Sequence, residues 1–288
     1  MLIRVGHEIA LVFPKPTAVV ALLSLHPSRA ATVRRAERPE VQPHTPWSEY
    51  TDRLGNRCTR LLAPAGRVVL RNDAIVEDSG QPDPQVWDAR EHPVHELPDE
   101  ALVYLLASRY CEVDSELREL ASARFGGLTP GWHRVTAICD FVHQHVRFDY
   151  LEARANRTAL DAFREATGVC RDYVHLAMTL CRILNIPARY CTGYLGDIGV
   201  PLVPPMDFTA WFEAYLGGRW YAFDPRNNVP RIGRVLMARG RDAADVALTT
   251  TFGVNTLDTF VVWADEVPAS SVAPSHAPRP NDSRVRVS

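Results

Sequence analysis

The chain has 288 residues, and 46% of them are hydrophobic, which is enough to bury a sizeable core in one large domain or two ordinary ones. A formal net charge of -2 gives no electrostatic reason to bind nucleic acid or an anionic membrane, so we expect neither as a partner. The six cysteines include no C-x-x-C pair and are spread singly along the chain, as in reduced intracellular proteins rather than disulfide scaffolds.

The amino-terminal apolar stretch is not a targeting segment. Residues 8–25 are rich in apolar side chains, but Pro14, Lys15 and Pro16 interrupt them. The stretch is therefore neither the apolar part of a secretory signal nor a membrane-spanning helix. We expect a cytoplasmic protein.

Residues 1–76 have the pattern of a β-rich domain. Residues 2–13 are strand-like and end at a proline pair, and later strand-like runs are separated by turns at Gly55-Asn56 and at 64–66. Short strands at this spacing predict a small sandwich or barrel.

Prolines and charged residues fill 77–99, which predicts an extended linker to a second domain at 100–267. Helices are expected from about residue 99, over 115–125 and over about 129–146. The final segment, 268–288, is rich in proline, serine and arginine, and we expect it to be a disordered tail. The predicted class is α+β, with a β-sandwich-like domain followed by an α/β core.

The helix expected at 129–146 contains a possible metal-ligand pair. Cys139 and His143 are four residues apart and could share one face, but His145 points elsewhere. No fourth ligand follows at a suitable spacing, so we expect no metal.

Cys170 lies where a loop turns into a helix. Apolar residues then recur with helical spacing and would pack the helix down, and Pro187 lies just beyond its end. A thiol at a helix amino terminus is expected to have a lowered pKa, because the helix end carries partial positive charge. The alternative is a buried structural cysteine, which is a common fate for this residue.

A hairpin follows at 210–224, with Gly217-Gly218 as its two-residue turn. This register pairs Leu216 with Arg219 and continues down to Trp211 opposite Asp224. Thr209 would then lie diagonal to Asp224 on the same face, about 7 Å away between backbones. A histidine at 209 could reach that carboxylate, whereas threonine cannot do the same work.

The ordered motifs of this chain resemble those of the bacterial transglutaminase-like family, relatives of papain-type cysteine enzymes. The matching stretches lie at 168–172, 185–190, 207–211, 224–225 and 240–246. Residues 1–76 are similar to the β-rich domain that often precedes the family's core, so the resemblance covers nearly all of 1–267.

The resemblance implies a transglutaminase-like, papain-like core with three catalytic positions. Cys170 occupies the position of the nucleophile and Asp224 that of the residue that orients the base, while Thr209 stands where the base histidine is expected. Asp207 and Trp211, in the same motif as Thr209, are expected at the binding site, with Trp211 as a core or site-wall aromatic rather than a side chain that stacks on a ligand. No cofactor is implied, and the partner would be a protein or peptide.

Two functions remain open from the sequence. The protein could be a thiol-dependent amide hydrolase or acyltransferase, helped by another histidine or by its substrate. It could instead be a catalytically inactive relative that binds a peptide or protein in its cleft. Of the other histidines, His175 should point away from the thiol, since it is rotated about 140° around the helix. The positions of His133, His143 and His145 relative to Cys170 cannot be inferred.

Overall fold

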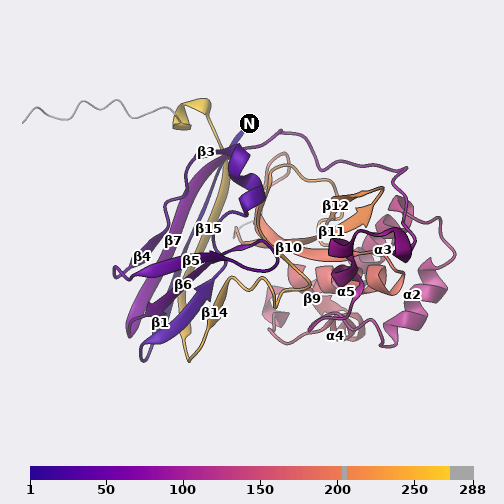
Figure 1. Ribbon diagram of the computed structural model, residues 1–288, viewed down its shortest axis with the longest axis horizontal. Helices are drawn as coiled ribbons and strands as arrows, with labels where there is room; N and C mark the ends of the chain where they lie inside the picture. Colours follow the sequence, from indigo (N-terminus) through magenta and orange to yellow (C-terminus); the bar gives the residue numbers. More distant parts are fainter. Residues whose placement is uncertain (203–205, 273–288) are drawn as a thin grey trace, which may run out of the picture.

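Antiparallel sheets make up one side of the protein, and helices around a third sheet make up the other (Figure 1). The structure is a computed structural model that describes residues 1–202 and 206–272. The α+β class expected from the sequence is confirmed. No helix in the described part of the chain is long and apolar enough to cross a membrane.

The amino-terminal strands form two sheets. The strands before residue 78 are β1 (Leu2–Phe13), β2 (Thr17–Ala21), β3 (Val33–Arg35), β4 (Glu40–Gln42), β5 (Trp47–Thr51), β6 (Arg57–Ala63) and β7 (Gly66–Glu77). One sheet has the order β15-β1-β7-β3, in which β15 is the late strand Thr256–Val267 and β4 also pairs with β7. The other has the order β14-β2-β6-β5, in which β14 is Thr249–Thr251. Ile9 and Leu70 of the first sheet and Leu61 of the second are buried in one shared core. That shared core makes the two sheets a sandwich.

The last strands of the chain belong to this sandwich. β15 (Thr256–Val267) pairs with β1 from Leu2 opposite Val267 to Val12 opposite Thr256, and β14 (Thr249–Thr251) pairs with β2. The expectation that 100–267 is one carboxyl-terminal domain is therefore wrong for these two strands. A period-two pattern predicts a strand but not a partner some 250 residues away. Of the expected tail 268–288, a short 3-10 turn (Ala269–Val272) is seen, and 273–288 lie outside the described residues.

The proline-rich segment 77–99 is anchored rather than loose. Its backbone is tied to the core by hydrogen bonds from Trp132 to Ala89 and from Gly217 to Arg90, and between Asp83 and Arg231. The segment therefore runs as a strap along the core, not as a free hinge between domains. It contains a 3-10 turn (Val94–Glu96).

The helical part contains the helices expected from the sequence, together with α4 and short 3-10 turns that were not expected. They are α1 (Asp99–Leu102), α2 (Leu117–Phe125), α3 (Trp132–His145), α4 (Ala159–Glu165) and α5 (Cys170–Ile183), with 3-10 turns at Val103–Leu105 and Tyr150–Glu152. A small parallel pair, β8 (Arg147–Phe148) and β9 (Thr167–Gly168), leads into α5. The central sheet has the order β12-β11-β10-β13, formed by β10 (Ala188–Leu195), β11 (Thr209–Leu216), β12 (Arg219–Phe223) and β13 (Arg234–Gly240).

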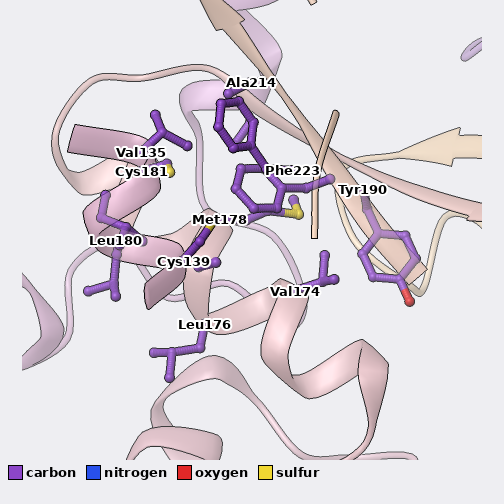
Figure 2. Packing of buried hydrophobic residues seen from close by; sticks show 14 of the residues in the cluster. Val135, Cys139, Val174, Leu176, Met178, Leu180, Cys181, Tyr190, Ala214 and Phe223 are labelled. Carbon is purple, nitrogen blue, oxygen red and sulfur yellow. The ribbon is translucent and has the colours of Figure 1, made fainter. Parts of the chain in front are cut away.

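Helix α5 is the core helix, and its burial fixes the place of Cys170. Figure 2 shows Met178 and Cys181 of α5 packed with Cys139 of α3 and Phe223 of β12. Residues from Asp172 to Arg182 are all buried, because the helix packs against β11 on one side and α2, α3 and α4 on the others. A helix held this firmly presents its first residue in a fixed position.

The sandwich and the central sheet meet beside that first residue. Phe208, just before β11, lies 5.7 Å from His7 of β1 and 5.7 Å from Phe260 of β15, measured between ring centroids. Phe208 shares the sandwich core with Tyr194 of β10. Two sequence-distant parts of the chain therefore build the wall next to Cys170.

Candidate active site

Cys170 is the first residue of α5, and its thiol lies between two cavities. The larger has a volume of about 430 Å³ and the smaller about 340 Å³. Cys170, Asp207, Phe208 and Thr209 line both of them. A cleft therefore continues on either side of the thiol, as a site that contacts an extended chain requires.

The surroundings of the thiol disfavour its charged form. Burial, with smaller contributions from the carboxylates of Asp207 and Asp224, raises the pKa of Cys170 to about 11, although Arg226 and the Ala210 backbone N–H act in the opposite direction. The expectation that the helix start lowers this pKa is wrong in its net direction. Desolvation and nearby negative charge outweigh the partial charge of one helix end.

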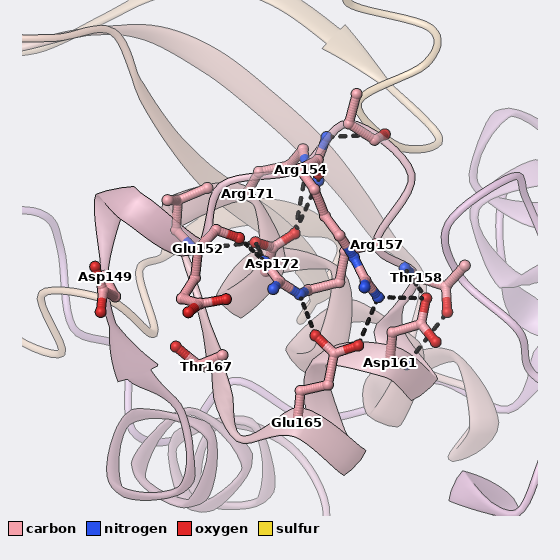
Figure 3. A network of polar contacts seen from close by, with 12 residues as sticks. Asp149, Glu152, Arg154, Arg157, Thr158, Asp161, Glu165, Thr167, Arg171 and Asp172 are labelled. Carbon is pink, nitrogen blue, oxygen red and sulfur yellow. Dashed lines mark hydrogen bonds and ion pairs between the residues drawn. The ribbon is translucent and has the colours of Figure 1, made fainter.

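Asp172 is the anion that the helix start stabilises. Its carboxylate accepts the Val169 backbone N–H at 2.9 Å and is fully buried. Arg157 donates to it at 3.1 Å and Arg171 at 3.0 Å, and Figure 3 shows Arg157 lying between Asp172 and Glu165. The cations closest to this helix end are thus paired with a fixed carboxylate rather than with the thiol.

Thr209 opens β11 and pairs with Gly193 of β10. Its side chain is 8% exposed, and its Oγ1 has no hydrogen-bond partner within the described chain. The structure therefore brings Thr209 and Cys170 to the same cleft. A hydroxyl does not titrate near neutral pH, so it cannot take a proton from the thiol or return one to a leaving group.

Asp224 follows β12 directly, and its carboxylate is engaged by other residues. The hairpin pairs Leu216 with Arg219 and continues to Phe212 opposite Phe223, which is the predicted register; β12 ends one residue before Asp224. Arg234 donates to the Asp224 carboxylate at 2.9 Å, and Asn227 donates through its backbone N–H at 3.0 Å and its side chain at 2.8 Å.

These bonds decide the charge of Asp224. Burial by itself would raise the pKa of its carboxyl, but Arg234 and Asn227 outweigh burial and hold the pKa below its usual value. The carboxylate lines a third cavity of about 90 Å³ beside Asp83 and Trp87, not the two that reach the thiol. The structure thus gives Asp224 an arginine as its partner where the family pattern implies a histidine.

The two expected binding residues differ in position. Asp207 lines both cavities, and burial raises the pKa of its carboxyl against the opposing effects of the Phe208 N–H and Arg226. Trp211 is 3% exposed, packs with Cys191, and lies under the Arg234 guanidinium at 5.3 Å. Trp211 is therefore a core residue that supports Arg234, and its expected place among the binding residues is corrected.

Three of the other candidate histidines are engaged away from the thiol. His175 is fully buried, stacks on Tyr110 at 5.0 Å and accepts the Ala243 N–H at its Nε2, so it points away from the cleft as expected. His143 donates to the Pro225 carbonyl at 3.1 Å, and His145 donates to the Phe163 carbonyl at 2.7 Å. Among residues 1–202 and 206–272, no histidine lines either cavity that reaches Cys170.

Sequence reasoning missed two arginines of the site. Arg226 lines the larger cavity and lies over the Phe148 ring at 4.3 Å, and Arg234 holds Asp224. Arg226 directly follows the Asp-Pro motif, and this position is the feature of the sequence that could have indicated it. The direction of its side chain, however, depends on the loop after β12. Within the described ranges, no group of three or more His, Cys, Asp or Glu side chains is arranged to hold a metal ion.

Comparison with known proteins identifies the family. Residues 118–225 match the model of the transglutaminase-like superfamily. The crystal structure of a proposed cysteine protease from Cytophaga hutchinsonii superposes with a TM-score of 0.79 at 32% sequence identity, covering 92% of this chain and 90% of that one. An uncharacterised protein of Mycobacterium leprae (strain TN) is 27% identical over 255 residues, covering 85% of this chain and 90% of its own length. The chain belongs to the transglutaminase-like superfamily, as its motifs predict.

Proposed function

We propose that this protein binds an extended peptide or protein segment in the cleft over Cys170 and does not use the thiol as an efficient amide-cleaving nucleophile. The observation that carries the proposal is the set of groups around the thiol: Asp207 and Thr209 line both cavities that reach it, where acid–base catalysis needs an imidazole. Similarity to a proposed cysteine protease supports a peptide as the ligand.

The chemistry of the thiol supports the same conclusion. With a pKa of about 11, Cys170 is a thiolate in only about one molecule in 10⁴ at pH 7. The thiolate is the nucleophile, and an amine leaving group must be protonated as the amide bond breaks. Without a positioned acid–base group, the rate falls by about 10²–10⁴.

A thiol amidase or acyltransferase assisted by its substrate is the second candidate. The observation that favours it is access: Cys170 is only partly buried and can be reached from both cavities, whereas the other five cysteines are buried. The substrate would have to supply the general base, because Thr209 cannot act as one. For either candidate we propose a cytoplasmic location, which suits a chain whose six cysteines are all free thiols.

Protection of Cys170 from alkylation tests the proposal. We expect peptides from a random extended library to slow iodoacetamide modification of Cys170, followed by mass spectrometry, and to remain uncleaved after prolonged incubation. A Cys170→Ser variant should retain peptide affinity, because binding does not need the thiol. Cleavage or acyl transfer that disappears in Cys170→Ser would contradict the proposal and establish the second candidate.

A further inference from the structure

The larger cavity beside Cys170 has the composition of a ligand pocket. Its volume of about 430 Å³ falls within the range of small-ligand sites. Much of its wall is apolar, contributed by Phe148, Tyr150, Leu195, Val200, Met206 and Val229. A few polar groups interrupt this wall, so the cavity suits an apolar group that carries one charged or polar end.

Arg226 is the available cation in this cavity. Arg231 also lines it, but its guanidinium donates to Asn227, to the Gly196 carbonyl and to Asp197. In the described part of the chain, Arg226 makes no hydrogen bond and has no carboxylate within ion-pair distance; its guanidinium lies 4.3 Å from the centre of the Phe148 ring. It lines the cavity together with Cys170, Asp207 and Tyr150, and its positive charge acts to lower the pKa of each of these three groups.

Thr209 supplies a second unsatisfied group. Its Oγ1 is buried without a partner, and its side chain is only 8% exposed. A buried hydroxyl left without a hydrogen bond is unfavourable, so a ligand that bonds to it recovers part of that cost. Thr209 and Asp207 line both cavities and so mark the junction between them. At that junction a carboxylate and a hydroxyl can accept backbone N–H donors.

We propose that the larger cavity binds a peptide carboxylate together with its apolar residue, with Arg226 pairing the carboxylate and Thr209 and Asp207 holding the backbone beside Cys170. This inference rests on the proposed peptide binding and names its chemistry. A carboxylate and an apolar side chain meet on one carbon atom at a peptide carboxyl terminus, which matches a single cation in an apolar cavity. The Asp207 carboxylate would repel the carboxylate of the peptide. Asp207 lies at the junction of the two cavities, however, where the peptide presents backbone N–H groups.

The test uses three acetylated tetrapeptides and isothermal titration calorimetry on the full chain. The first is trialanyl-phenylalanine with a free carboxylate, and the second is its carboxyl-terminal amide. The third is the amide with glutamate before the phenylalanine, so that its only carboxylate is on a side chain. Charge-assisted pairing with a guanidinium predicts that the free acid binds at least about 10-fold more tightly than the first amide.

Three arginine variants assign the effect to Arg226. Arg226→Gln should weaken the free acid by about 10-fold or more and abolish the preference for acid over amide. Arg219→Gln is the matched control, because Arg219 also lies over an aromatic ring, that of Tyr221 at 5.1 Å, but lines neither cavity. Arg219→Gln should keep the full preference. Arg226→Lys, which retains the charge, should keep part of it if the variant folds with an unchanged melting temperature.

The outcomes separate this inference from the function it rests on. Tight binding of the glutamate peptide that depends on Arg226 supports the carboxylate site and makes a side chain its source. Equal affinity for the acid and both amides overturns the inference and leaves peptide binding standing. If none of the three binds while library peptides still protect Cys170, only the inference fails. If no peptide protects Cys170, both fail.

Discussion

Replacing Thr209 by histidine is expected to raise the rate of Cys170 alkylation at pH 7 by about 100-fold or more. The side chain at 209 lines the same two cavities as the thiol, so an imidazole there has room to extend toward it. An adjacent imidazolium stabilises the thiolate and lowers the cysteine pKa. Each unit by which the pKa falls from about 11 increases the thiolate tenfold at neutral pH.

Amide hydrolysis by the same variant should rise less than alkylation. The Asp224 carboxylate that would orient the imidazole already accepts hydrogen bonds from Arg234 and Asn227. A base without its orienting partner is a weaker catalyst. The matched control is Thr209→Gln, which adds bulk without a titrating group and should leave the alkylation rate unchanged. A folded Thr209→His variant that alkylates at the wild-type rate would show that 209 does not face the thiol.

Replacing Asp172 by alanine is expected to lower the free energy of unfolding by about 3–5 kcal/mol. The change removes the fully buried one of the two carboxylates that pair with Arg157, whose own side chain is 1% exposed. It also removes the acceptor of the Val169 N–H at the start of α5. Urea unfolding monitored by circular dichroism measures the loss, which is a large share of the roughly 5–15 kcal/mol typical of a domain.

Two further variants assign the loss to the buried pair. Asp172→Asn keeps an oxygen for the Val169 N–H and should lose less than the alanine variant. Glu165→Ala removes the other carboxylate that contacts Arg157, but Glu165 is 34% exposed and should cost less than about 1 kcal/mol. An Asp172→Ala protein as stable as the Glu165→Ala protein would mean that Arg157 is not held by Asp172.

The sequence predicts those features whose cause is local. The apolar spacing after Cys170 defines α5, and Gly217-Gly218 fixes the hairpin register from Leu216 to Phe212. The motifs at 168–172 and 207–211 adjoin these elements, and they contribute Cys170 and Thr209 to one cleft. In each of these cases a periodicity or a two-residue turn determines the geometry.

The features that the sequence does not reveal depend on distant partners. Nothing in the pattern of β15 indicates that it pairs with β1, because strand pairing is a tertiary contact. The hydrogen bond from Arg234 to Asp224 joins residues ten positions apart through a loop whose course is not encoded in a short motif. The helix start alone predicts the wrong direction for the thiol pKa, because burial and the nearby carboxylates of Asp207 and Asp224 are set by tertiary structure.

The pH dependence of Cys170 alkylation in the unmodified protein tests the central claim most directly. Iodoacetamide reacts with the thiolate, so the rate at Cys170, followed by mass spectrometry from acidic pH to about pH 10, reports its ionisation. We expect the rate to keep rising through this range without a plateau, because the thiol pKa is about 11. A plateau with a midpoint below about pH 7 would mean that a cation stabilises the thiolate, and would contradict the account of Cys170 as an unactivated thiol.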